Sequence, residues 1–208
     1  MKSTRVRVIL AAVAVGATLT ACSPAQVGAA AVVGDQRISS SELEADVKEY
    51  EAAVVASGIN KSQLQLRGSV PQAVLTNVIA IEQLDQLGAR KGVTVTEAEV
   101  DAFLTQIATQ GGQTQRMPDE QIAVNVGVPP SKLRDLVRIT LVERKLLAGL
   151  GAGQDEASQQ AASQKLAQEA ATIKVVRSPR YGVANPQSQG GADSYVDAGR
   201  FGAVPASS

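Results

Sequence analysis

The sequence contains no histidine and no tryptophan, and it has only three tyrosines, two phenylalanines and one cysteine. Without histidine, the chain lacks the most common general base and the most common metal ligand, which argues against His-based triads and zinc sites. Because Cys22 is the only cysteine, the chain cannot form an intramolecular disulfide. The scarcity of aromatic residues means that a core has to be built from Leu, Ile, Val and Ala.

The first residues resemble an export signal. A start with three basic residues precedes an apolar run over 8–19, which is too short to span a bilayer stably. The run ends in "LTAC", which resembles the bacterial lipobox, in which the cysteine is lipidated and becomes the mature N-terminus. We expect a signal peptide over 1–21, a lipid on Cys22 and a tether over 22–29. The alternative is a chance cysteine after an ordinary signal peptide.

The charge that remains after Cys22 is slightly negative. This part of the chain has 17 basic and 20 acidic residues, a net charge of −3, and it contains no block of Lys and Arg. Nucleic acid is therefore not expected as a partner.

Helical periodicity dominates the middle of the chain. Ser39 and Glu42 form a capping box that begins a helix, and Thr96 and Glu99 form another. Pro71 suits the first position of a helix that ends near Arg90. Pro129-Pro130-Ser131 indicates a stop followed by a cap. Apolar stripes and helix-prone composition predict further helical segments, namely a short one from 118, one over 132–148 and one over 155–171.

Two short segments have the composition of strands. Val32-Val33 precede a turn at Gly34-Asp35, and the β-branched run over 172–176 is the obvious pairing partner. The sequence therefore predicts a mainly α fold of five to six helices, with a small two-stranded sheet that joins the start and the end of the domain. We place this domain at 30–183 and expect a disordered tail over 184–208, which is rich in Gly, Ser, Pro and Gln.

Four stretches in this order resemble the SurA N-terminal chaperone domain: "VVGDQRIS", "VTVTEAEVDAFL", "PPSKLRDLVRITLVERKLL" and "IKVVRSPRYG". The positions that match the family's motifs are Val33, Gly34, Ile38, Ser39, Val95, Thr96, Glu99, Val100, Gly127, Val128, Leu133 and Arg134. The family's usual Asn before Gly34 is missing. "SPRYG" resembles the close found in secreted actinobacterial relatives, apart from its Ser178-Pro179.

The resemblance implies work outside the cytoplasm, on apolar segments of newly translocated chains. Family members such as the lipoprotein foldase PrsA also carry a parvulin-type prolyl isomerase domain, usually with active-site histidines. The stretch between Leu150 and Ile173 is too short for that domain, and histidine is absent. By resemblance, this chain is the chaperone part without the isomerase.

The residues themselves give no sign of catalysis. Glu97, Glu99 and Asp101 cluster in the first turn of an expected helix, where carboxylates interact favourably with the helix dipole. No nucleophile motif, phosphate-binding loop or metal-ligand cluster is present in the sequence. We therefore predict no catalytic residue, no cofactor and no metal.

A chaperone needs apolar surface that a non-native chain can reach. The candidates are surplus apolar residues on the two strongest helices: Leu75, Ile79, Ile139 and Val142. Their alternative interpretation is ordinary core, which we favour.

Three function classes follow. The first is a lipid-anchored chaperone-like protein on the outer face of the cytoplasmic membrane, which binds unfolded or newly translocated polypeptides without catalysis. The second is an interaction lipoprotein that binds one envelope partner. The third, a prolyl isomerase, is disfavoured by the length of the chain and by the missing histidine.

Overall fold

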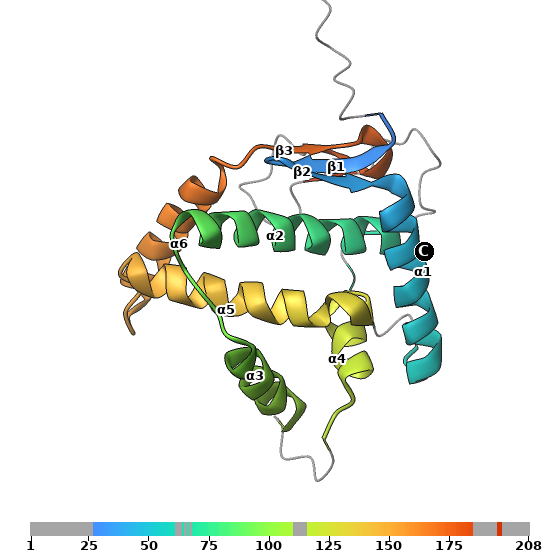
Figure 1. Ribbon diagram of the computed structural model, residues 1–208, viewed down its shortest axis with the longest axis horizontal. Helices are drawn as coiled ribbons and strands as arrows, with labels where there is room; N and C mark the ends of the chain where they lie inside the picture. Colours follow the sequence, from blue (N-terminus) through green and yellow to red (C-terminus); the bar gives the residue numbers. More distant parts are fainter. Residues whose placement is uncertain are drawn as a thin grey trace, which may run out of the picture.

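The computed structural model describes residues 27–60, 64, 66, 68–109, 116–184 and 195–196. In these residues the mainly α fold is confirmed, with a small sheet and six α-helices: α1 (Ser40–Ser57), α2 (Val70–Arg90), α3 (Glu97–Thr109), α4 (Asp119–Val126), α5 (Leu133–Gly149) and α6 (Glu156–Ala170). Two short 3-10 helices accompany them, η3 (Pro130–Lys132) and η4 (Pro179–Tyr181). Figure 1 shows the sheet, α2, α5 and α3 as successive layers.

The sheet joins the two ends of the domain, as the sequence predicted. Strand β1 (Ala29–Val33) lies in the middle and pairs antiparallel with β3 (Val175–Arg177), so that Val32 faces Val176. A third strand, β2 (Gln36–Ser39), pairs with the other edge of β1. The sheet was predicted to have two strands, and the residues of β2 were predicted only to lead from the turn into the first helix. Gly34, with φ at +58°, and Asp35 form the predicted turn, which is a two-residue hairpin turn for which glycine is well suited.

The two predicted capping boxes are present. The Ser39 amide donates to Glu42 Oε2 at 2.7 Å, and the Glu42 amide donates to Ser39 Oγ at 3.1 Å. The Thr96 amide donates to Glu99 Oε2 at 2.8 Å, and the Glu99 amide returns a bond to Thr96 Oγ1. Local sequence therefore sets where α1 and α3 begin.

Two other helix starts differ from the prediction. Helix α2 begins at Val70 rather than at Pro71, and the Ser69 amide before it donates to Gln72 Oε1 at 2.9 Å. Ser131 does not cap α5. Its amide and hydroxyl both donate to the carboxylate of Glu49 on α1, at 2.8 and 2.7 Å. The local sequence predicted that Ser131 would cap α5, but Ser131 bonds to Glu49 of another helix instead.

The buried apolar residues form two clusters. The main cluster joins the sheet to α1, α2, α6 and the second half of α5, and comprises Ala30, Ala31, Val33, Ile38, Leu43, Tyr50, Ala53, Val54, Val74, Leu75, Val78, Ile79, Leu87, Val124, Val142, Leu146, Leu166, Ile173 and Tyr181. The second cluster lies between α3, α4 and the first half of α5, and comprises Val100, Leu104, Ala108, Ile122, Ala123, Val128, Leu133 and Val137.

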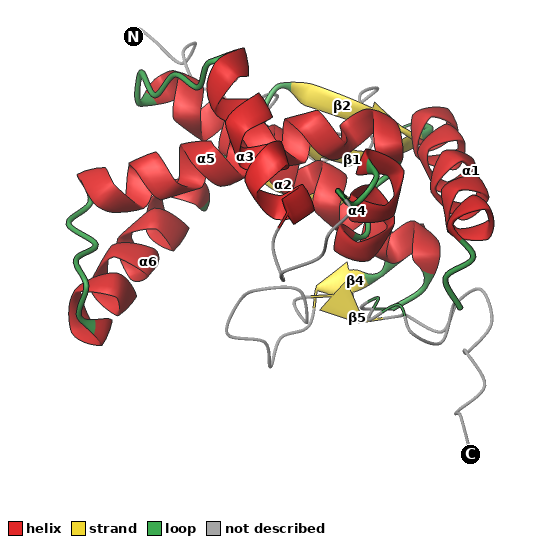
Figure 2. Cartoon of the chain, turned by 90° about the horizontal axis from the view of Figure 1, so that it is seen from below, coloured by secondary structure: helices red, strands yellow, loops and turns green. Residues whose placement is uncertain are grey.

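Helix α2 is the centre of the domain, because the sheet packs on one side of it and α5 on the other. Gln86 Nε2 donates to the carbonyl of Val33 at 2.8 Å, and Gln83 Nε2 donates to the carbonyl of Ala170 at 2.9 Å. These bonds connect α2 to the first strand of the domain and to the end of α6. Seen from below, α6 and the end of α5 project to one side of the body (Figure 2).

The predicted ends of the chain lie largely outside the described residues. The predicted signal peptide and Cys22 lie outside them, as does most of the predicted tether. Most of the predicted tail also lies outside them. Strand β5 (Tyr195–Val196), within that tail, pairs with β4 (Val183–Ala184).

Candidate functional site

The four residues proposed from the sequence as polypeptide-binding are all buried. Leu75 and Ile79 lie on α2 with 0% and 7% of their surface exposed, and Ile139 and Val142 lie on α5 with 5% each. Helices α2 and α5 pack along each other, and Gly88 permits this. A Cβ at Gly88 would stand 2.7 Å from Val142 Cγ1. In this conformation these side chains belong to the core and are not available to a partner.

Apolar surface does occur in two other places, a hollow beside the end of α1 and the edge of the second cluster. Large apolar residues that are exposed are few in the described part of the chain: Val27, Val55 and Val126. A hollow of about 220 Å³ lies beside the end of α1, and its lining residues are Tyr50, Glu51, Val54, Leu64, Leu66, Gly68 and Val70. This volume is below that of typical small-molecule sites, roughly 300–1,000 Å³, so it suits a side chain rather than a cofactor.

The second place is the edge of the second cluster. Half-buried apolar side chains pack against this cluster from α3, from α5 and from the segments before α3 and α4: Val95, Phe103, Ile107, Met117, Leu136 and Leu141. The guanidinium of Arg144 lies 4.4 Å from the ring centroid of Phe103, which is a cation–π contact. Large apolar side chains that are only half covered are the kind of surface a non-native chain can use.

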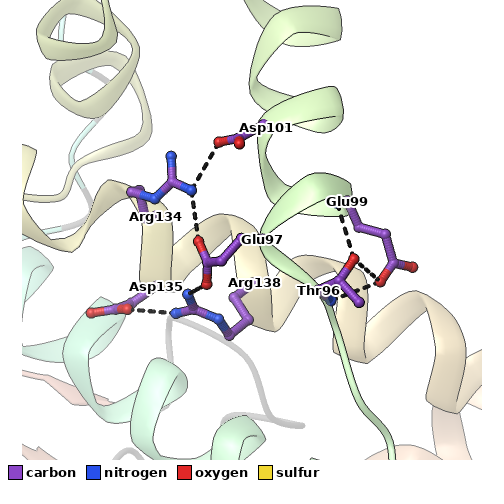
Figure 3. Close-up of polar contacts among 7 residues, drawn as sticks. All are labelled: Thr96, Glu97, Glu99, Asp101, Arg134, Asp135 and Arg138. Carbon is purple, nitrogen blue, oxygen red and sulfur yellow. Dashed lines mark hydrogen bonds and ion pairs between the residues drawn. The ribbon is translucent and has the colours of Figure 1, made fainter.

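Charged residues connect α3 and α5 (Figure 3). Arg134 Nη2 lies 2.7 Å from Glu97 Oε2 and 2.8 Å from Asp101 Oδ1. Arg138 Nη2 lies 2.5 Å from Glu97 Oε1. Lys145 Nζ lies 2.6 Å from Glu99 Oε1 and donates to the carbonyl of Thr94 at 2.7 Å.

The carboxyl groups of this network are stabilised in their charged form. Hydrogen bonds from Arg134 and then Arg138 lower the pKa of Glu97. The hydrogen bond from Lys145, followed by those from Thr96, lowers the pKa of Glu99 to about 2. A general acid or base needs a pKa near the working pH, so these shifts run against catalysis. They support the structural role that the sequence suggested for the cluster.

The partners of these carboxylates were not predicted from the sequence. Arg134, Arg138 and Lys145 are spaced by four and seven residues, which places them on one face of α5. That spacing was visible in the sequence, but the helix facing them was not. In the described residues no group of three or more metal-ligating side chains is present. None of the described helices has the length and hydropathy needed to cross a membrane.

The fold and these surfaces define a mainly helical domain whose ends are joined in one sheet and whose apolar edge lies between α3 and α5. Residues 1–148 match the family described as the SurA-like N-terminal domain. The match covers more than half of the chain, so the protein belongs to this family, as the motifs predicted. The matched region ends inside α5, and strand β3 lies beyond that region. No curated protein and no solved structure matches the chain.

Proposed function

We propose that this protein is a lipid-anchored, extracytoplasmic chaperone-like protein that holds non-native secreted polypeptides without catalysis. Membership of the SurA-like N-terminal domain family carries the proposal. The half-buried apolar side chains around the second cluster support it, because a holdase needs apolar surface beside polar groups that keep the free protein soluble.

The proposed anchor is Cys22. An apolar run followed by "LTAC" supports lipidation of this cysteine and attachment to the outer face of the cytoplasmic membrane. Metabolic labelling with a palmitate analogue tests it. Label is expected on the wild-type protein and is expected to disappear in Cys22→Ser, whereas equal labelling of both proteins would contradict the anchor.

The holdase activity is tested with the mature chain, residues 22–208, carrying Cys22→Ser so that no lipid is attached. Insulin reduced with dithiothreitol serves as the client, because its B chain aggregates and scatters light. We expect the protein to suppress scattering without ATP. Unchanged scattering at several-fold molar excess of the protein would contradict the proposal. A proline-limited refolding assay on the same preparation is expected to show no acceleration, because no prolyl isomerase role is proposed.

One observation favours a second candidate, an interaction lipoprotein that binds a single envelope partner. Exposed large apolar residues are few among the described residues, and the hollow beside α1 is small. Limited apolar surface suits one shaped partner better than many unfolded ones. Crosslinking in the envelope separates the two proposals. Many unfolded chains support the holdase, and one folded protein supports the dedicated binder.

A further inference from the structure

Helix α3 is held from one side of the domain. Its principal contacts are with α5 and α4, and neither the sheet nor α1 or α2 contacts it to a comparable extent. Figure 1 shows it on the far side of α5 from the sheet. Removing α3 from its place would therefore leave the main cluster intact.

The surface under α3 is apolar. Val100, Leu104 and Ala108 of α3 are at most 2% exposed. They pack with five residues of α4, the following loop and the first turns of α5, which we call the seat: Ile122, Ala123, Val128, Leu133 and Val137. A segment with apolar side chains at helical spacing fits this seat, because that is the pattern α3 presents to it.

The edge of the seat is cationic. Arg134, Arg138 and Lys145 of α5 receive the acidic first turn of α3. The paired side chains are between 29% and 63% exposed. Ion pairs this exposed are individually weak and are screened by salt, so they orient α3 without fixing it firmly.

We propose that α3 is a displaceable resident of the seat, and that a client segment with acidic residues followed by apolar residues at helical spacing takes its place. The inference rests on the proposed holdase function and names its binding site. Helix α3 shows what the seat accepts, with carboxylates against the three cations and an apolar stripe against the seat. When α3 leaves, the apolar seat becomes exposed. While α3 is in place, α3 covers it.

A competitor that binds only the open form has an apparent affinity reduced by the fraction of open molecules. If a substitution raises the small open fraction by some factor, the affinity for a competitor rises by the same factor. Two independent measurements, α3 opening and competitor binding, must then agree.

Glu97→Lys in the mature chain is the informative variant, because it places a cation against Arg134 and Arg138. Its control is Glu169→Lys, which makes the same charge change in the ion pair between Lys91 and Glu169, away from α3. Glu97→Gln provides a milder form should the reversal fail to fold. Opening is measured by amide hydrogen exchange in α3 and α2. Binding is measured with a fluorescent peptide of residues 94–109 and with a charge-reversed version in which its acidic residues are lysine.

We expect Glu97→Lys to speed exchange in α3 by about threefold to tenfold, with α2 unchanged, and to tighten binding of the peptide by the same factor. Glu169→Lys is expected to change neither, and the charge-reversed peptide is expected to bind at least about tenfold more weakly. Exchange that rises equally in α3 and α2 would overturn the inference. An affinity for the peptide that Glu97→Lys leaves unchanged would overturn the inference as well.

The insulin assay separates failure of this inference from failure of the proposed function. If Glu97→Lys and Glu169→Lys suppress aggregation equally well, the holdase stands and the seat is not its binding site. If no variant suppresses aggregation, the holdase proposal fails and the displacement of α3 is judged by exchange and peptide binding alone.

Discussion

The two buried clusters differ in how the chain builds them. The main cluster brings together β1 and β3 from the two ends of the domain, and buried or half-buried polar side chains of α1 and α2 bond to distant backbone. The second cluster comes from one stretch of chain between Val100 and Val137, and exposed ion pairs surround it. Disrupting the main cluster should therefore unfold the whole domain, whereas disrupting the second cluster should loosen only the helices around it.

The carboxyl groups near the clusters also differ. On the helices of the main cluster, loss of solvation raises the pKa of Asp46 and of Glu82. Beside the second cluster, hydrogen bonds from cations lower the pKa of Glu97 and Glu99. Burial opposes charge in one region, whereas pairing favours charge in the other.

Removing a leucine side chain from each cluster in turn gives the largest expected difference between them. Leu75→Ala in the main cluster should lower the free energy of unfolding by about 2–5 kcal/mol, because a fully buried side chain is lost and a cavity remains. Leu104→Ala should release mainly α3, with a smaller loss of protection in α2. Hydrogen exchange across the domain measures both variants. Equal loss of protection everywhere in both variants would mean that the clusters unfold as one.

A glycine pair tests the close packing of α2 on α5. Gly88→Ala should destabilise the domain relative to Gly149→Ala by about 1–2 kcal/mol, because only at Gly88 does the new methyl meet Val142. Nothing lies within 4 Å of a Cβ at Gly149, so that change should be neutral or slightly stabilising. Urea unfolding of the two variants measures the difference. Equal midpoints would show that α5 shifts to accept the methyl.

Local signals in the sequence predicted much of the fold. The capping boxes at Ser39 and Thr96 depend on residues three positions apart, and the structure contains both. The pairing of Val32-Val33 with the returning strand was predictable because few other segments had strand character. Strand β2 was missed, since only four residues separate its hairpin turn from α1.

The candidate site was harder to predict, because it depends on which elements face each other. Periodicity identified Leu75 and Val142 as apolar but could not tell a covered face from an open one. The ion pairs of Arg134 were also not predictable, because its carboxylate partners lie more than thirty positions earlier in the chain. Ser131 illustrates the point, because its local role as a cap gave way to Glu49 on another helix.

A smaller effect is expected at the link between α1 and α4. The Tyr50 hydroxyl donates to the carbonyl of Val124 at 3.1 Å. Tyr50→Phe should lower the free energy of unfolding by about 0.5–1.5 kcal/mol, towards the low end because that carbonyl also accepts from the Gly127 amide. Thermal unfolding measures the loss. An unchanged midpoint would show that this hydrogen bond contributes nothing measurable to holding α4 against α1.

The smallest expected effect is a difference in pH response. The pKa of Glu99 is about 2 in the folded protein against an ordinary 4.5, so its contribution is complete above about pH 4.5 and is lost as the pH falls towards 2. The raised pKa values of Asp46 and Glu82 act in the opposite sense, because protonation on acidification relieves the cost of their burial. Between about pH 5 and pH 3, exchange in α3 should therefore rise about twofold to fivefold relative to α2, after correction for intrinsic rates. Glu99→Gln should reduce this response, since it removes one of the two carboxyl groups whose pKa is lowered there, the other being Glu97. A parallel change in α3 and α2 would show that both clusters titrate as a single unit.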